Sequence, residues 1–537
     1  MGLSDIVVIV VYLGLLLFIG FRFAGRQRTT DTYFVANRRV PGWAMGLSLT
    51  ATIITSITFV AYPGAAYAGN WSLMVPNLMF PAVLLLAGSI LVPFFRHSVE
   101  RSAYAYFGRR FGTGVQLYSA LAFAVGQFAK MGFVIYLAAL TLNSITGWNV
   151  VAAMAITGGI AVVCSMVGGV EAAIWADVVQ GFVLWAGIFI SVGCLLWLTP
   201  GGTHAAVPTA LANHKIGFAA PAFSLKESSL VVLVIYGFFF YLQKYTADQT
   251  VVQRYLVART DRAAVRGIAL GAVLCVPMWA SFMLIGTLLW SFYRLSHERF
   301  PPGLVRADQV FPHFLATHLP PGAAGLFIAS FLGAAISMLA SDINCVSLVG
   351  VDDFYRNLRP NATDRQCLYA GKLIAGSTGV AAVLIAVQLA RFGGPALSFY
   401  YTVTAIAAGG LAGLFLLAFM SRRAGSASAH AGIVTSLLVT LWAALTANGG
   451  HILNLGLWNF PWHEYLIGAA GHLSLLAGAL LFTFIFPARN LADPALTLYG
   501  WLARERLRLA VNAEEARTEV PDAKLRPQKA GADRRRR

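Results

Sequence analysis

Long apolar segments, separated by short polar, basic or Gly/Pro-rich stretches, recur along the whole chain. A helix needs about 20 mostly apolar residues to cross the hydrocarbon of a bilayer, and these segments are long enough to do so. We therefore predict an all-α polytopic membrane protein with thirteen transmembrane helices. The predicted spans lie near residues 3–21, 43–69, 73–95, 117–142, 149–168, 174–198, 229–250, 265–293, 323–349, 369–390, 396–420, 429–447 and 462–486.

Composition excludes an ordinary soluble enzyme. Of the 537 residues, 58% are hydrophobic and 11% are charged, whereas a soluble domain has about half apolar and about a quarter charged residues. The first span lacks the basic start and the small-residue cleavage pattern of a signal peptide, so we expect it to be retained. Residues 1–486 are predicted to form one transmembrane domain of a multi-pass protein of the cell membrane. In a bacterium, this membrane would be the inner membrane.

The formal net charge of +17 is distributed unevenly between the two sides of the predicted membrane domain. With the N-terminus outside, the cytoplasmic loops and the tail of residues 487–537 carry most of the 39 Lys and Arg residues. The opposite loops carry Lys215, Lys226, Arg294, Arg299, Arg306 and Arg391. The positive-inside rule therefore predicts an N-out, C-in topology. We expect the basic tail to be largely disordered and to contact anionic lipid, and we expect no nucleic-acid partner.

Lys130 and Asp177 are charged residues inside predicted spans, where a charge at mid-membrane costs roughly 2.5 to 3.5 kcal/mol on insertion scales. Lys130 lies at the centre of the fourth span. It is either half of a structural ion pair, with Asp177 or another buried carboxylate, or an anchor for an anion. Asp177 lies shallower, in the sixth span. It is either a helix-start carboxylate stabilised by the helix dipole or a cation ligand.

Clustered hydroxyl groups predict two discontinuous spans. Residues 46–66 carry several Ser and Thr residues and then Pro63 and Gly64. An interrupted helix frees backbone carbonyls in mid-bilayer, where they suit a transported cation. In the ninth span, Ala334, Ser337 and Ser341 share one helix face, and hydroxyl oxygens suit a hard cation such as sodium. The alternatives are hydroxyls that bond to the preceding helical turn and close packing of small residues.

Five further groups of residues occur along the chain in an order and at spacings that are typical of one protein family. They are residues 34–39 with Ser48 and Ala51, Tyr106 with residues 110–112, residues 168–180, residues 248–255, and residues 337–355. Together they resemble the sodium:solute symporter family, from the first cytoplasmic loop to about the eleventh span. The resemblance implies a five-plus-five inverted-repeat core of the leucine-transporter type, with repeats at about 43–198 and 229–420. It also implies sodium as the coupling ion and no cofactor.

The resemblance further implies positions for the sodium ligands. The main site would use the backbone carbonyls of Ala51, Ile54 and Ala334 and the hydroxyl of Ser337. A second site would use Asp177, Ser337 and Ser341. Met338 stands where the family has another hydroxyl residue. Because sodium prefers oxygen ligands to a thioether, we expect the main site to be weakened or altered.

Residues 127–142 of the fourth span resemble the bacterial sialic acid symporters within this family, which have an arginine where this chain has Lys130. This resemblance implies that Lys130 holds a substrate carboxylate. A lysine keeps the charge but lacks the bidentate fork of an arginine. The other implied substrate contacts are Thr55, Thr58 and Asn77, with Lys244, Tyr241 and Tyr245 lining the pocket from the seventh span.

We therefore predict a secondary active symporter that couples inward sodium flow to the uptake of a small organic carboxylate, such as a sialic acid or a sugar acid. The alternatives are a proton-coupled carrier, a neutral-sugar carrier of the same fold and a transporter-like sensor. An enzyme is disfavoured because the loops outside the membrane have no catalytic His/Asp/Glu cluster. The sequence leaves the oligomeric state open, and a monomer suffices for transport.

Overall fold

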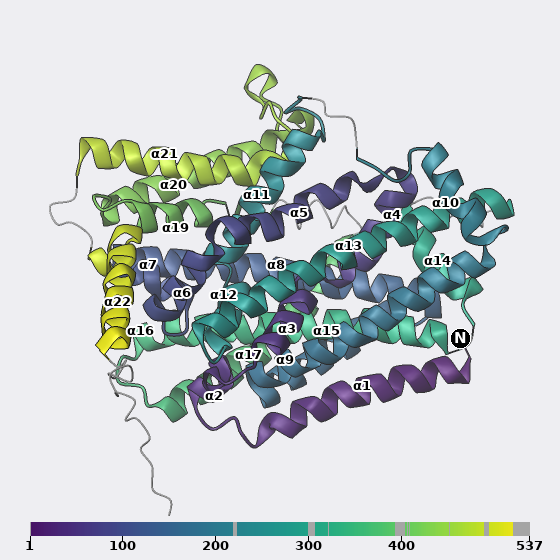
Figure 1. The fold of residues 1–537 in the computed structure, drawn as a ribbon, viewed down its shortest axis with the longest axis horizontal. Helices are drawn as coiled ribbons and strands as arrows, with labels where there is room; N and C mark the ends of the chain where they lie inside the picture. The colour runs from purple at the N-terminus through teal and green to yellow at the C-terminus, as the bar shows by residue number, and fades with distance from the viewer. Residues whose placement is uncertain are drawn as a thin grey trace, which may run out of the picture.

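Nearly all of the described chain is helical (Figure 1). The computed structural model describes residues 2–218, 223–298, 307–320, 322–392, 403–404, 406–407, 409–450, 452–487 and 493–518. Within these ranges, the strand-type contacts amount to an isolated bridge between Val40 and Ala258. The all-α class is therefore confirmed.

The helices appear in chain order as α1 (Leu3–Ala24), α2 (Thr30–Val35), α3 (Gly42–Ile53), α4 (Ser56–Ala68), α5 (Val75–Val83), α6 (Ser89–Ser98), α7 (Ala103–Phe111), α8 (Thr113–Thr146), α9 (Val150–Leu198), α10 (Gly202–Ala212), α11 (Leu230–Ala247), α12 (Gln249–Val257), α13 (Asp261–Ser296), α14 (Val310–His318), α15 (Ala323–Val349), α16 (Arg356–Leu358), α17 (Asp364–Phe392), α19 (Leu411–Met420), α20 (Ser426–Gly450), α21 (Ile467–Ile485) and α22 (Leu498–Thr518). A π-helix, Gly350–Tyr355, joins α15 to α16.

The long helices lie side by side and run roughly along the horizontal direction of Figure 1. The short helices α10 and α14 lie at the right-hand end, beside the N-terminus, and α2, α16 and α22 lie at the left-hand end. The N-terminus and the last described helix are therefore at opposite ends of the bundle.

Nine of the described helices are long and apolar enough to cross a membrane, and two bent helix pairs raise that number to eleven. This supports the polytopic class. Part of the predicted span 396–420 lies outside the described residues, and its end is the short helix α19. The total of thirteen spans and their orientation stay predictions.

The predicted spans 149–168 and 174–198 are joined in the single element α9, without a loop between them. Its backbone breaks at Gly169, which has φ 60° and ψ −159°. That conformation is essentially restricted to glycine, and a Cβ atom there would lie 2.8 Å from the carbonyl oxygen of Tyr33. Gly169 thus lets the chain change direction where the sequence analysis placed a short loop.

The second span is discontinuous, as predicted. Helices α3 and α4 meet at an angle of 60°, and the two residues between them, Ile54 and Thr55, have extended backbones. A β-branched run from Ile53 to Thr55 favours such an interruption because these side chains are restricted in a helix. Pro63 lies beyond the break, inside α4.

The prediction that the ninth span is also discontinuous is wrong. Helix α15 is continuous from Ala323 to Val349, because the polar side chains of this span bind side chains of neighbouring helices and need no unwound backbone. The second break lies instead at Asp248, between α11 and α12, where the backbone is extended. The Asp248 carboxylate caps α12 by accepting a 2.9 Å hydrogen bond from the Thr250 amide.

Helix α15 is buried along almost its whole length and packs against α1, α8, α9 and α17. Helix α3 approaches α13 backbone to backbone, since a Cβ atom on Gly46 would lie 2.5 Å from the Gly267 carbonyl oxygen. Small residues permit such close approach of membrane helices. These contacts fix the broken span and the polar face of α15 in the interior.

Part of the basic tail is helical, and the prediction that the tail as a whole is largely disordered stays a prediction. Helix α22 begins at Leu498, and Trp501 is buried against Phe94, with their ring centroids 5.7 Å apart. This apolar anchor explains why the tail is ordered there. Residues 519–537, with the terminal arginines, lie outside the described residues.

Candidate functional site

A fully buried carboxylate, Asp177 on α9, lies at the junction of α3, α12 and α15. Its Oδ2 accepts hydrogen bonds from Ser48 Oγ at 2.5 Å and from Arg254 Nη2 at 3.1 Å. Its Oδ1 accepts a hydrogen bond from Ser337 Oγ. The predicted second sodium ligands Asp177 and Ser337 therefore lie together.

Arg254 on α12 completes this group. Its Nη2 also donates to Ser341 Oγ at 2.8 Å and to Thr52 Oγ1 at 3.1 Å. We call the group formed by Asp177, Ser48, Thr52, Arg254, Ser337 and Ser341 the Asp177 cluster. Residue 254 lies between the predicted spans 229–250 and 265–293, so the sequence pattern places it outside the membrane and predicts no site role for it. The break at Asp248 keeps α12 inside the protein, where Arg254 is fully buried.

The residues predicted for the main sodium site are all buried next to this cluster. Ala51 and Ile54 lie at the end of α3, and Ala334 lies one turn before Ser337 on α15. The last carbonyls of a helix have no partner within it, so the end of α3 offers oxygen atoms for a cation. Met338 is also buried here and contributes no oxygen.

Lys130 does not pair with Asp177 but with Asp342 on α15. Its Nζ lies 3.0 Å from Asp342 Oδ1 and 2.9 Å from Oδ2. Lys244 lies 2.5 Å from Asp248 Oδ2, at the break between α11 and α12. We call these four residues the Lys130 cluster. Its formal charges cancel, and its side chains are at most 17% exposed.

Of the other predicted substrate residues, two lie at the first helix break and one lies on α5. Thr55 precedes α4 at the first break, and Thr58 is buried in the first turn of that helix. Asn77 on α5 is engaged with two tyrosines: its Nδ2 donates to the Tyr62 hydroxyl at 2.5 Å, and its Oδ1 accepts from the Tyr241 hydroxyl at 2.7 Å. Asn77 therefore ties α5 to α4 and α11.

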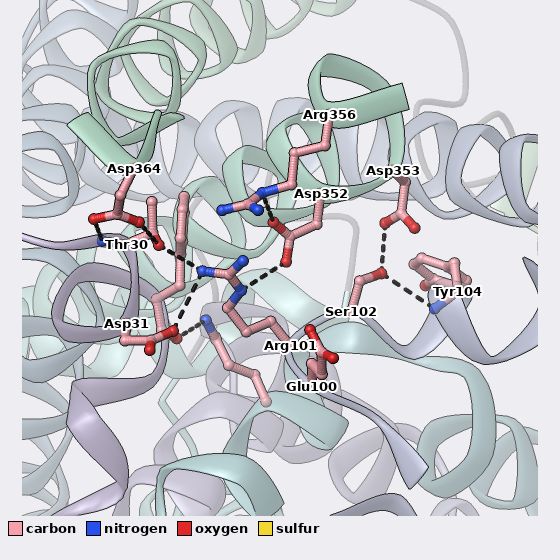
Figure 2. A network of polar contacts seen from close by, with 12 residues as sticks. Thr30, Asp31, Glu100, Arg101, Ser102, Tyr104, Asp352, Asp353, Arg356 and Asp364 are labelled. Atoms are coloured by element: carbon pink, nitrogen blue, oxygen red, sulfur yellow. Dashed lines mark hydrogen bonds and ion pairs between the residues drawn. The ribbon is translucent and has the colours of Figure 1, made fainter. Parts of the chain in front are cut away.

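A second polar network lies at the left-hand end of the bundle in Figure 1, between α2, the α6–α7 loop and the π-helix (Figure 2). Arg101 Nη1 donates to Thr30 Oγ1 at 2.5 Å and lies 3.3 Å from Asp31 Oδ1, while Arg101 Nε lies 3.0 Å from Asp352 Oδ2. The Thr30 amide donates to Asp364 Oδ2 at 3.2 Å. Arg101 therefore joins segments that are far apart in the sequence.

The residues after Arg101 extend this network toward α11 and α12. Ser102 Oγ donates to Asp353 Oδ2 at 2.5 Å, and the side chain of Gln249 bonds both the Ala103 amide and the Arg101 carbonyl. Burial raises the pKa of the Tyr104 hydroxyl well above its usual range, so the hydroxyl stays protonated and donates to the Ala247 carbonyl at 2.9 Å. The network thus reaches the second helix break.

The sodium:solute symporter family matches residues 33–436. The chain belongs to this family. The symporter is 30% identical over 448 residues to the sodium/sialic acid symporter NanT of Aliivibrio fischeri, covering 82% of this chain and 88% of NanT. It is 30% identical over 495 residues to the sodium/sialic acid symporter SiaT of Proteus mirabilis, covering 91% of this chain and 97% of SiaT.

Solved structures agree with these relatives. A Na+-coupled sialic acid symporter in a substrate-bound outward-open state superposes on this symporter with a TM-score of 0.83 at 29% identity, covering 91% of this chain and 99% of that one. Mhp1, a nucleobase-cation-symport-1 family transporter, gives a TM-score of 0.52 at 16% identity, over 85% of this chain and 95% of Mhp1. The symporter shares their fold.

Membership of the family confirms the predicted activity class. The family consists of transporters, so this symporter couples the uptake of a solute to sodium, as a multi-pass protein of the cell membrane. Both sialic acid relatives are bacterial proteins, which fits the predicted inner-membrane location.

Proposed function

We propose that this symporter imports a small organic carboxylate, such as a sialic acid or a sugar acid, and that Lys130 holds the carboxylate of the substrate. The observation that carries the proposal is the contact of Lys130 with both oxygens of Asp342. It shows a carboxylate already bound to this lysine in the protein interior. The substrate would share or displace that partner, and the sialic acid relatives support an acid of this kind.

Charge balance supports coupling to sodium. The Lys130 cluster is neutral before a substrate arrives, so an anion that enters alone adds an uncompensated charge to a buried site, which is costly. One sodium ion bound nearby cancels that charge. We propose that this sodium binds the carbonyls of Ala51, Ile54 and Ala334 and the hydroxyl of Ser337.

The remaining predicted site residues have supporting parts in this proposal. Thr55, Thr58 and Asn77 contact the polar groups of the substrate from α4 and α5, and Lys244 adds positive charge from α11. Ser341 belongs to the cation-binding face of α15, and Asp177 contacts that face from α9 through Ser337. No cofactor has a role in this scheme, and one chain contains all of its parts.

We further propose that residues 1–486 form one transporter domain of thirteen spans, with the N-terminus outside, the basic tail of residues 487–537 in the cytoplasm and inverted repeats at about 43–198 and 229–420. The position of the N-terminus and α22 at opposite ends of the bundle supports an odd number of spans (Figure 1). Each proposed repeat also opens with a broken span, at Thr55 and at Asp248.

A thermal-shift screen of the detergent-purified symporter tests the substrate and its coupling together. Sialic acids, uronates, monocarboxylates and neutral sugars are each added in sodium or in choline at constant ionic strength. A ligand that binds the folded state raises the melting temperature by mass action. We expect an acid to stabilise the protein in sodium and not in choline. Stabilisation by a neutral sugar, or by an acid equally in both salts, would contradict the proposal and favour a neutral-sugar or proton-coupled carrier.

A further inference from the structure

An apolar groove of about 190 Å³ lies between α6, α11 and α19, and the first residue of α22 completes it. Thr246 of α11 also lines the groove, but its hydroxyl donates to the Leu242 carbonyl at 2.7 Å. The polar group of Thr246 is therefore satisfied within its own helix. The other walls include Ile90 and Leu91 of α6, Leu416 and Met420 of α19, and Leu498 of α22.

The groove opens to the outside of the bundle. Leu86, which lines it, is 73% exposed, and Met420 is 51% exposed. Its walls belong mainly to the predicted spans 73–95, 229–250 and 396–420, so the medium outside the groove is the bilayer. Sites for small molecules usually measure roughly 300 to 1,000 Å³. This smaller groove fits one hydrocarbon chain that continues into the bilayer.

The groove lies at the depth of the cytoplasmic leaflet in the proposed topology. Leu242 and Thr246 are in the last two turns of α11, and Met420 is the last residue of α19. Both of these spans end on the cytoplasmic side in that topology. Leu498 begins α22, in the cytoplasmic tail. A chain in the groove therefore belongs to a lipid whose headgroup is on the cytoplasmic side.

Helix α22 marks the membrane surface at this end. It runs across the end of the bundle, steeply inclined to the long helices (Figure 1). Since the long helices cross the bilayer, a helix in this orientation lies along its surface. Tyr499 and Leu507 of α22 are exposed large side chains, and Arg504 and Arg506 are exposed on the same helix. Tyrosine and arginine are typical of such an interface.

Two arginines follow the wall of the groove directly. Arg422 and Arg423 come two and three residues after Met420, and both are exposed. The segment 421–425 that contains them has no acidic residue. Arg110 of α7 holds this segment in place, since its Nη2 donates to the Ser421 carbonyl at 2.5 Å. Basic side chains at the cytoplasmic face attract the headgroups of anionic lipids.

We propose that this groove binds an anionic phospholipid of the cytoplasmic leaflet, with one acyl chain between α6, α11 and α19 and the phosphate at Arg422 and Arg423. The lipid then bridges α19 and the end of α11, which directly precedes the helix break at Asp248. It stabilises the packing of these helices. The assignment to a leaflet rests on the proposed topology, and the site itself is independent of the transported solute and of sodium.

Thermal unfolding of the full-length purified symporter in detergent tests the headgroup site. The mole fraction of phosphatidylglycerol in the micelles is raised, and phosphatidylcholine keeps the total lipid constant. A lipid that binds the folded state raises the melting temperature by mass action, so we expect phosphatidylglycerol to stabilise the wild type more than phosphatidylcholine does. In Arg422→Ala with Arg423→Ala, the mole fraction for half-maximal stabilisation should rise about twenty-fivefold, because each arginine near an anionic headgroup contributes about fivefold in affinity.

A matched double variant separates a specific site from general attraction to a basic surface. Arg359→Ala with Arg365→Ala removes the same charge from exposed positions near the start of α17, which does not line the groove. It should respond to phosphatidylglycerol as the wild type does. An equal loss of response in both double variants would overturn the inference. So would a wild type that the two lipids stabilise equally.

The acyl-chain part of the site is tested by filling the groove. Leu416→Trp should remove the extra stabilisation by phosphatidylglycerol and leave the melting temperature in phosphatidylcholine nearly unchanged. If this variant fails to fold, Met420→Trp makes the same test at the half-exposed mouth. Glycerol 3-phosphate, which has the phosphate but no chains, should not stabilise the wild type. Stabilisation by glycerol 3-phosphate, or a full phosphatidylglycerol response in the folded groove variant, would refute binding of a chain. None of these measurements contains substrate, so they leave the proposed transport function untouched.

Discussion

Lys130 is the residue on which the substrate proposal depends most directly, and its partner determines what a substitution does. Lys130 contacts both carboxylate oxygens of Asp342, and the Asp342 side chain is fully buried. Removing one member of a buried ion pair leaves the other charge uncompensated, at a cost of about 3 to 5 kcal/mol. A single substitution of Lys130 therefore changes stability and substrate binding together, and only a double substitution separates them.

We predict that Lys130→Ala lowers the melting temperature and that Lys130→Ala with Asp342→Asn regains most of the loss, because the second variant removes both charges. Neither variant should respond to an acid that stabilises the wild type, while both keep their stabilisation by sodium. The melting temperatures of both variants, measured with and without the acid and with and without sodium, test this prediction. An acid response in the double variant would exclude Lys130 as the anchor, and loss of its sodium response would assign Lys130 a structural role.

Met338 offers a second prediction at this scale. It is fully buried and follows Ser337 in the chain, and it has a thioether where the proposed sodium site would gain from an oxygen. We expect Met338→Thr to lower the sodium concentration for half-maximal uptake severalfold, at a stability cost of about 1 to 3 kcal/mol from lost packing. Met338→Leu, which is similar in volume and has no oxygen, is the control and should leave the sodium dependence unchanged. Equal sodium dependence in both variants would remove Met338 from the vicinity of the ion.

Among the helices, the sequence identified most spans but not all of their interruptions. Apolar length is a strong signal, so the described helices fall where spans were predicted. Clustered hydroxyls were a weaker signal: they marked a real break near Thr55 and a false one in α15, where Ser337 and Ser341 bind Asp177 and Arg254 instead. The partners of Lys130 and Asp177 depend on how α8, α9, α12 and α15 pack against one another. The residues around each position in the sequence do not reveal this packing.

The turn inside α9 gives a prediction for a whole element. Gly169→Ala should destabilise the protein, because φ 60° with ψ −159° costs a non-glycine residue of order 1 to 3 kcal/mol and the new Cβ meets the Tyr33 carbonyl. Gly159 is the matched control, since it lies in the same helix and a Cβ atom added there would meet no atom within 4 Å. Gly159→Ala should be neutral or stabilising by up to about 1 kcal/mol. Melting temperatures of the two variants in the same detergent test this, and equal values would contradict the role given to Gly169.

For the whole molecule, the network around Arg101 joins α2, the α6–α7 loop and the π-helix at the end of the bundle that the proposed topology places in the cytoplasm (Figure 2). A carrier with a central site must open its two ends in turn, so we expect these contacts to break when substrate is released inside. The related sialic acid symporter was solved in an outward-open state, which requires a closed cytoplasmic end. The Arg101 network is therefore expected to favour the outward-facing form of the carrier.

Arg101→Ala should shift the symporter toward the inward-facing form, and Cys345 provides a natural reporter. Cys345 is fully buried on α15, one turn beyond Ser341 toward the π-helix, where its thiol donates to Gln253. Loss of about 1 kcal/mol of ion-pair energy changes the ratio of two states about fivefold. We therefore expect a maleimide reagent to label Cys345 about fivefold faster in Arg101→Ala than in the wild type, and sodium to slow the reaction in both.

Two controls make this measurement specific. Cys345→Ala in the Arg101→Ala background should remove the labelled peptide, since the other cysteines are distinguished by mass spectrometry. Arg109→Ala removes a positive charge from the neighbouring helix α7 and leaves the Arg101 contacts intact, so it should label at the wild-type rate. If Arg101→Ala also labels at the wild-type rate, the network does not hold the cytoplasmic end closed, and the closure must come from the apolar packing of α15 against α8 and α9.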